Sequence, residues 1–135
     1  PTLMESLVLS QTSTTPSIKF DVKSLNFTIK GECRPENVLT YFSPIINWLN
    51  KFKNWSINLN EPITASLAFH FKLAYYNTSS AKFLFNIFEK MKSIEEEGIK
   101  VKVKWHYDEL DEDLLENGKE FEKILGLDFD FVSLN

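Results

Sequence analysis

Apolar and polar side chains alternate along several stretches of the chain, which is the period of a β-strand with one buried face. The clearest alternation covers residues 65–75, where Leu, Phe, Phe and Leu take every second position. Residues 99–105 alternate Ile, Val, Val and Trp with three lysines. Weaker alternation over 18–22 and 25–29 predicts a β-hairpin, and residues 127–133 predict a last strand. These patterns predict a sheet with one apolar and one polar face.

Apolar residues recur at the helical period in three other stretches of the chain. The first follows Gly31, which we expect to end the preceding strand. It opens at Arg34-Pro35-Glu36-Asn37, with proline near the first helical position. Pro44 lies inside this stretch and is expected to kink the helix or to divide it in two. A polar loop is expected to follow, with a possible short strand at residues 55–59.

The second helical stretch passes through Phe83 and Phe88 and is expected to end at Gly98. The third follows an acidic segment, and Gly126 is expected to end it. The residues expected to face inward from this third helix are Leu114, Leu115, Gly118, Phe121, Ile124 and Leu125.

The predicted order of elements is β-β-α-(β)-β-α-β-α-β, and helices between the later strands imply parallel crossovers. We therefore predict an α/β fold whose mixed β-sheet carries its helices mainly on one face. The length of 135 residues fits one domain. Residues 1–16, rich in Ser and Thr, are expected to form a flexible arm with an edge segment around residues 7–9, and residues 17–135 the domain.

The composition of the chain excludes several classes of protein. Nineteen acidic against 15 basic residues, a net charge of -4, supply no general attraction to nucleic acid or to anionic lipid. No apolar run approaches the ~20 residues that cross a bilayer, and no secretion signal is recognised. Cys33 is the only cysteine, so no internal disulfide can form. We therefore expect a cytoplasmic protein that binds neither nucleic acid nor membrane.

The candidate functional site is the corner where the central strand meets the second helix. This corner is Asn77-Thr78-Ser79-Ser80, and Lys82 follows one turn later. It places small hydroxyl side chains at a helix N-terminus, where unpaired N–H groups and the positive end of the helix dipole converge. From the residue types alone two interpretations stay open: one hydroxyl only caps the helix, or the corner carries a function.

Other clusters point less clearly to chemistry. The acids of residues 108–116 lack the spacing of a calcium-binding EF-hand loop and fit a solvated first helical turn. His70 and His106 could pair in space but have no third zinc ligand. A short basic row on an acidic protein fits a solvated sheet face better than a nucleic-acid site; it comprises Lys100, Lys102 and Lys104. We find no catalytic constellation or phosphate loop, and therefore expect no enzyme, no metal and no cofactor.

Three motifs, in this order, carry a resemblance to a known family. They are Arg34-Pro35-Glu36-Asn37, then Tyr76-Asn77-Thr78-Ser79-Ser80-Ala81-Lys82, and then Trp105-His106-Tyr107-Asp108 followed by Asp111-Glu112-Asp113. Over about residues 17–133 the chain resembles the SiaC family of bacterial regulatory phosphoproteins. The fold of that family is similar to STAS domains and anti-sigma-factor antagonists, so the resemblance implies a STAS-like fold.

The resemblance also implies a function, that of a non-enzymatic partner-switching protein in cyclic-di-GMP signalling and biofilm regulation. An ATP-dependent protein kinase of the histidine-kinase-like ATPase fold would phosphorylate it, and a PP2C-type phosphatase would reverse this. The unphosphorylated form would bind and activate a diguanylate cyclase or a similar signalling partner. The phosphate acceptor falls on Thr78, with Ser79 as the fallback. The implied partner-binding residues are Asn77, Thr78, Ser79, Ser80 and Lys82.

The alternative function is a ligand-binding module. In this interpretation the open polar face of the sheet holds an anionic small molecule. The side chains available for it are Lys100, Lys102, Lys104 and His70.

Overall fold

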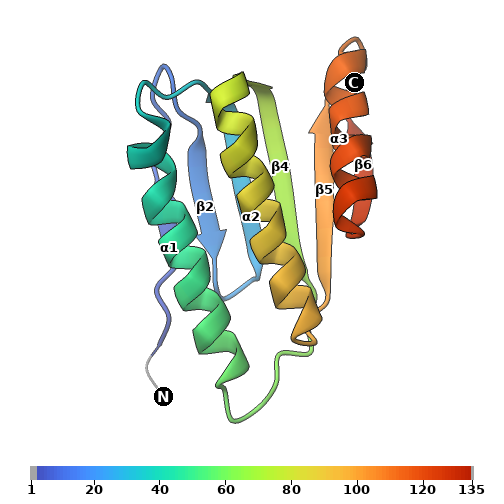
Figure 1. Ribbon diagram of the computed structural model, residues 1–135. Coiled ribbons are helices and arrows are strands. Elements are labelled where there is room, and N and C mark those ends of the chain that lie inside the picture. The colour runs from blue at the N-terminus through green and yellow to red at the C-terminus, as the bar shows by residue number, and fades with distance from the viewer. Residues whose placement is uncertain (1–2, 135) are drawn as a thin grey trace.

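The alternating stretches pair into one six-stranded sheet, whose strands lie side by side in the order of the sequence. The computed structural model describes residues 3–134 (Figure 1). Its elements are β1 (Leu7–Leu9), β2 (Ser17–Asp21), β3 (Asn26–Cys33), α1 (Val38–Ile57), β4 (Leu67–Tyr76), α2 (Thr78–Glu96), β5 (Val101–Tyr107), α3 (Glu112–Leu125) and β6 (Asp128–Ser133).

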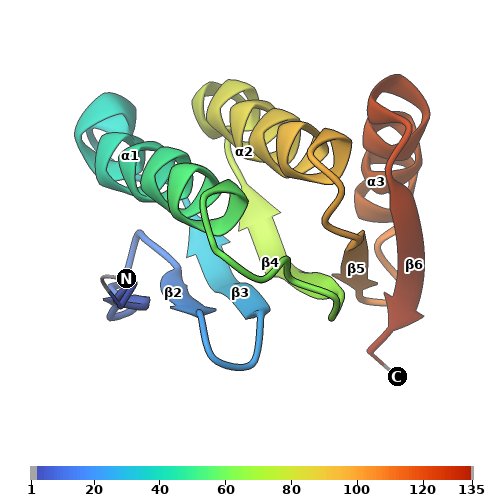
Figure 2. The same ribbon diagram turned by 90° about the horizontal axis from the view of Figure 1, so that it is seen from below.

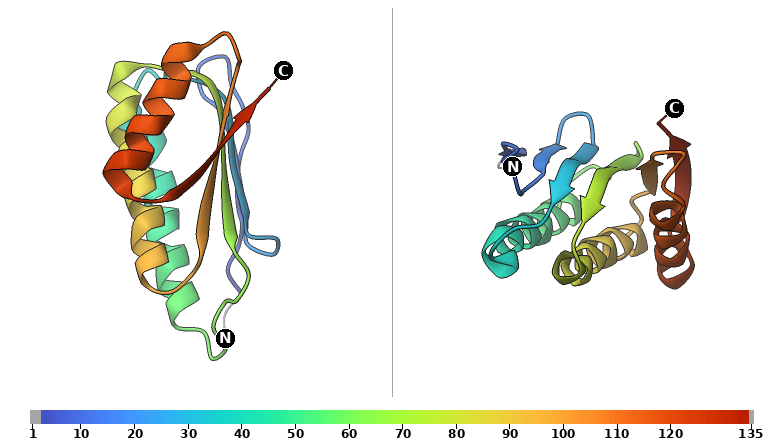
Figure 3. Two further views of the ribbon diagram at one scale, coloured as in Figure 1. Left: turned by 90° about the vertical axis from the view of Figure 1, so that its right-hand side faces the viewer. Right: turned by 90° about the horizontal axis from the view of Figure 1, so that it is seen from above.

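Two kinds of connection build this sheet. β1, β2 and β3 are antiparallel neighbours, whereas β3, β4, β5 and β6 run parallel and are joined by α1, α2 and α3. Parallel neighbours need a crossover, which the helices supply. All three helices cover the same face of the sheet (Figures 2 and 3). The predicted mixed sheet with one helix-covered face and one open face is therefore confirmed.

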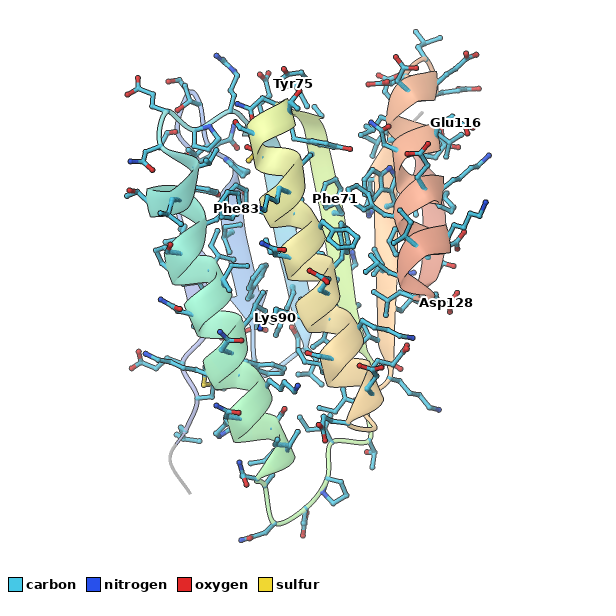
Figure 4. The ribbon with its side chains drawn as sticks, viewed as in Figure 1. Phe71, Tyr75, Phe83, Lys90, Glu116 and Asp128 are labelled. Atoms are coloured by element: carbon cyan, nitrogen blue, oxygen red, sulfur yellow. The ribbon has the colours of Figure 1, made fainter. Side chains whose placement is uncertain are left out.

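The helix-covered face of the sheet holds an aromatic core. Phe71 of β4, which is labelled in Figure 4, stacks on Trp105 of β5 with their ring centroids 4.2 Å apart, and both side chains are fully buried. The Trp105 indole N–H donates to the carbonyl oxygen of Leu114 in α3 at 3.1 Å. A Cβ built on Gly118 would lie 2.6 Å from the Trp105 ring. The third helix therefore lies so close to Trp105 that its backbone, without a side chain, forms the contact.

The first helix begins later than the sequence suggests. Asn37 is its N-cap, with its side-chain oxygen accepting from the Thr40 N–H at 3.0 Å, so Pro35 precedes the helix instead of opening it. Of the two effects expected of Pro44, the division of the helix is wrong, because α1 is one helix of 20 residues, and the kink stays a prediction. Buried residues on both sides of Pro44, including Phe42 and Ile45, hold the helix on the sheet across the missing hydrogen bond.

The short strand expected at residues 55–59 is not formed, because α1 continues to Ile57. Its buried stripe runs on through Phe52 to Ser56. The helical period therefore extends through a segment in which Trp55, Ile57 and Leu59 also happen to alternate.

The expectation that Gly31 ends the strand is wrong. The strand continues to Cys33, and its register with β4 shifts between Gly31 and Glu32. Gly31 has φ +124°, a conformation that side-chain-bearing residues rarely adopt. The glycine thus marks an irregularity inside the strand.

The described part of the N-terminal arm packs onto the domain. β1 pairs antiparallel with β2, which confirms the expected edge segment. The Trp48 indole N–H donates to the carbonyl oxygen of Glu5 at 2.9 Å, and the Tyr41 hydroxyl donates to that of Pro16 at 3.2 Å. Residues 1 and 2 of the expected arm lie outside the described residues. The boundary at residue 16 stays a prediction.

The third helix buries a narrower stripe than expected. Leu114, Gly118 and Leu125 are buried, whereas Ile124 is 68% exposed. Ile124 instead lines a hollow between α2 and α3. Gly126 ends the helix in the left-handed conformation, as predicted.

We expect Gly118→Ala to lower the free energy of unfolding by about 1–3 kcal/mol, because its new methyl group overlaps the Trp105 ring. Helix propensity acts in the opposite direction, since alanine is favoured over glycine by roughly 1 kcal/mol. Urea unfolding measures the difference. Lys119→Ala on the exposed side of α3 is the control and should change stability by about 0.5 kcal/mol at most. A Gly118→Ala protein as stable as the original would contradict the tight contact.

Candidate functional site

The corner between β4 and α2 is fixed by Asn77. Its side-chain oxygen accepts from the Ser80 N–H at 3.0 Å, so Asn77, not one of the hydroxyl residues, is the N-cap of α2. Its own backbone N–H donates to the carbonyl oxygen of Cys33 at 3.0 Å, which ties the corner to the end of β3. Asn77 therefore orders the turn through both its side chain and its backbone. The hydroxyl groups are therefore not needed to cap the helix.

The three hydroxyl residues of the corner have different surroundings. Ser80 is fully buried, and its Oγ lies 3.5 Å from the Cys33 Sγ. Ser79 is exposed and donates to the Asn77 side-chain oxygen at 3.3 Å. Thr78 is exposed, and its hydroxyl forms no hydrogen bond with any of residues 3–134. Thr78 is thus the hydroxyl most available to an external group, and Ser80 the least.

The backbone around Thr78 favours a negative charge. The N–H groups of Thr78 and Ser79 have no carbonyl partner among the described residues, because they open the helix. They also lie at the positive end of the α2 dipole. Lys82 is exposed one turn further along the helix. An anion bound at or attached to Thr78 would therefore be stabilised by groups already in place.

A hollow of about 350 Å³ opens beside Thr78, between the start of α2 and the outer side of α3. Burial raises the pKa of the Tyr76 phenol in its wall; a hydrogen bond with Asn117 opposes this, and the charges of Glu120 and Asp111 add to it. The phenol is therefore neutral at pH 7. Lys82 is not among the residues that line the hollow, which are Tyr76, Asn77, Thr78, Ala81, Asn117, Glu120, Phe121 and Ile124.

On the open face of the sheet, most of the predicted basic row is neutralised. Lys104 lies 3.2 Å from an Asp130 carboxylate oxygen, and Lys102 lies 3.4 Å from the same atom and 3.7 Å from Asp128. Lys100 is exposed and lies immediately before the first residue of β5. Two of the three lysines of the row are therefore already paired with carboxylates, and the alternative function stays a prediction.

The two histidines do lie together, with ring centroids 6.1 Å apart. Within residues 3–134, however, no group of three metal-ligating side chains is present, either here or in the acidic segment. Two acids of that segment have a local role: Asp108 accepts from the Leu110 N–H at 2.9 Å, and Asp111 caps α3 by accepting from the Leu114 N–H at 3.0 Å. Among the same residues, no helix is long and apolar enough to span a membrane.

His106 is a half-buried base, and one of its two ring nitrogens lacks a hydrogen-bond partner among the described residues. Burial lowers its pKa to about 4, and the charges of Lys72, His70 and Lys104 act in the same direction. The pKa of His70 is lowered by burial, Lys72 and Lys104. The His106 Nε2 is buried and has no hydrogen-bond partner within the described residues. An unpaired buried polar atom costs about 1–3 kcal/mol, so His106 is a position at which an additional contact would stabilise the fold.

We predict that stability falls as the pH is lowered from about 6.5 toward 4. In this range the unfolded chain protonates its histidines, whereas the folded protein does not protonate His106, so the unfolded state binds more protons. Urea unfolding at about pH 7 and about pH 5 measures the effect. His106→Gln removes the group that titrates and should reduce the difference between the two pH values. An unchanged difference in that variant would contradict the assignment to His106.

The chain is similar to known proteins over almost its whole length. The model of a family described as "SiaC family regulatory phosphoprotein" matches residues 9–134. An uncharacterized protein of Pseudomonas aeruginosa strain UCBPP-PA14 is 29% identical over 126 residues, 93% of this chain and 94% of that protein. Apo-SiaC from P. aeruginosa is 26% identical with a TM-score of 0.82, over 96% of this chain and 100% of that one. P. aeruginosa SiaC in complex with the diguanylate cyclase SiaD, which it activates, is 27% identical with a TM-score of 0.82. This match covers 94% of this chain and 98% of that one.

Proposed function

The chain belongs to the SiaC family of regulatory phosphoproteins, and from this we propose that it is a partner-switching signalling protein controlled by phosphorylation of Thr78. It is not an enzyme in this proposal. Its unphosphorylated form binds and activates a diguanylate cyclase or a similar signalling protein. An ATP-dependent kinase of the histidine-kinase-like ATPase fold attaches the phosphate in the cytoplasm, and a PP2C-type phosphatase removes it.

The observation that carries this proposal is the state of the Thr78 hydroxyl. It is exposed and has no hydrogen bond with the described residues, while the neighbouring Ser79 hydroxyl is engaged by Asn77 and Ser80 is buried. Asn77 already caps α2, so a change at Thr78 leaves the cap intact. These differences favour Thr78 over Ser79 as the acceptor.

Phosphate at this position would change binding without refolding the domain. It adds roughly -1.5 to -2 charges and three strong acceptors, which the free N–H groups of Thr78 and Ser79 and the α2 dipole can stabilise. The same charge would project beside the hollow that Phe121 and Ile124 line. A partner that had placed an apolar side chain there would then have to desolvate a dianion. Modification therefore favours release of the partner.

The partner in the proposal comes from the similarity to SiaC, which is known in complex with the diguanylate cyclase SiaD as its activator. On this chain the partner-binding surface comprises the exposed corner residues Thr78 and Ser79 with Asn77 and Lys82, and Ser80 supports them from within. We propose that Lys82, one turn along α2, contacts the phosphate.

We expect Thr78→Ala to abolish phosphorylation in the protein's own host, measured as loss of the slower band on a phosphate-affinity gel. Thr40→Ala is the matched control, because Thr40 is also exposed in the first turn of an asparagine-capped helix. It should keep the slower band. Thr78→Ala should also still activate the host's diguanylate cyclase when purified, whereas the phosphorylated protein should not. If Thr78→Ala leaves both the modification and the phosphate-dependent loss of partner binding unchanged, the proposal is wrong.

A further inference from the structure

Two lysines face each other across the open face of the sheet, in a row of side chains that holds no carboxylate. Lys30 of β3 lies directly opposite Lys72 of β4. His106 of β5 follows in register after the Phe71–Trp105 pair and lies opposite Val132 of β6. Like charges placed directly across two strands repel each other. The row therefore contains an electrostatic cost that a bound anion would remove.

The neighbouring rows show that this sheet elsewhere pairs its lysines. Lys104 contacts Asp130, and Lys102 contacts both Asp128 and Asp130. By contrast, neither Lys30 nor Lys72 has an ion pair with any residue between 3 and 134. Lys72 thus differs from Lys102 and Lys104, the two lysines of β5 on the same face of the sheet.

Lys72 and His106 line one side of a hollow of about 480 Å³. The hollow lies near the carboxyl ends of the parallel strands β4 and β5. Its volume falls in the range of small-molecule sites. Leucines form most of its apolar wall, and two of them stand largely in solvent: Leu110 is 88% exposed and Leu134 is 63% exposed.

Two carboxylates also line this hollow, and both already have hydrogen bonds. Asp108 accepts from the Leu110 N–H, and Asp111 accepts from the Leu114 N–H as the cap of α3. Asp108 directly follows β5, and Asp111 also lines a neighbouring hollow together with Ala74 and Tyr76 of β4, so both carboxylates lie beside the sheet. The hollow therefore combines Lys72, which has no ion pair among the described residues, with two carboxylates that already accept backbone hydrogen bonds and with leucines around its mouth.

We propose that this hollow binds a small organic acid, with its anionic group at Lys72 and His106 and its apolar body against Leu110 and Leu134. This site is distinct from the Thr78 corner. It also differs from the basic row of Lys100, Lys102 and Lys104, most of which is neutralised by Asp128 and Asp130.

Octanoate is a suitable probe, because it combines a carboxylate with an aliphatic chain. Octanamide has nearly the same shape without the charge, and inorganic phosphate has charge without the chain. Titration of the whole protein with octanoate, followed by NMR, should give saturable shifts of the His106 ring and of the Leu110 and Leu134 methyl groups. A dissociation constant of about 1 mM or lower is expected for a ligand of this size. Octanamide and phosphate should each bind at least about tenfold more weakly.

Lys72→Gln should weaken octanoate binding by about tenfold, since it removes the charge and keeps most of the side chain. Lys100→Gln, an equally conservative change at the other end of β5, should leave binding unchanged. Thermal unfolding checks that both variants fold; Lys72→Gln should not lose stability, because Lys72 has no ion pair to lose. The proposal is overturned if octanoate binds the original protein and Lys72→Gln with equal affinity. It is also overturned if the NMR shifts of His106, Leu110 and Leu134 do not saturate. A loss of Thr78 phosphorylation has no bearing on this result.

Discussion

The contact between Trp105 and the backbone at Gly118 determines where the third helix lies. Trp105 stacks on Phe71 in the centre of the sheet, and its indole N–H is fixed by the Leu114 carbonyl oxygen. With the tryptophan held from two sides, α3 can approach only because Gly118 has no side chain. Both hollows described above have one wall on this helix: Leu114 borders the one on the sheet face, and Phe121 the one beside Thr78. The position of one buried indole therefore shapes two separate surfaces of the molecule.

The Asn77 corner serves as a rigid support for an exposed hydroxyl. Its side chain caps α2, and its backbone N–H is held by the end of β3. Because these bonds do not involve the Thr78 hydroxyl, the group is free to be modified while the helix keeps its cap. In such an arrangement a phosphate changes the charge of a surface and leaves the packed core unaltered. The family's description as regulatory phosphoproteins fits a site of this kind.

Much of this architecture could be predicted from the sequence because its signals are local. The alternation over β4 and β5, the helical period of α2 and Gly126 after α3 each agree with the structure. The errors arose where tertiary packing outweighed a local signal. Pro44 does not divide α1, because the buried stripe of the helix continues on both sides of it. The ion pairs that neutralise Lys102 and Lys104 depend on β6 lying beside β5, which no spacing along the chain reveals. The same holds for the hollow at Lys72, whose walls come from four separate segments.

The central claim is that Thr78 is a phosphorylated switch residue. Peptide-mapped mass spectrometry of the protein purified from its own host, grown under several conditions, tests it most directly. The account predicts phosphate on Thr78 in a fraction of the molecules that changes with the growth condition, and no phosphate on the buried Ser80. A corner from Asn77 to Lys82 that is unmodified under every condition, or modified only at Ser79, would contradict it.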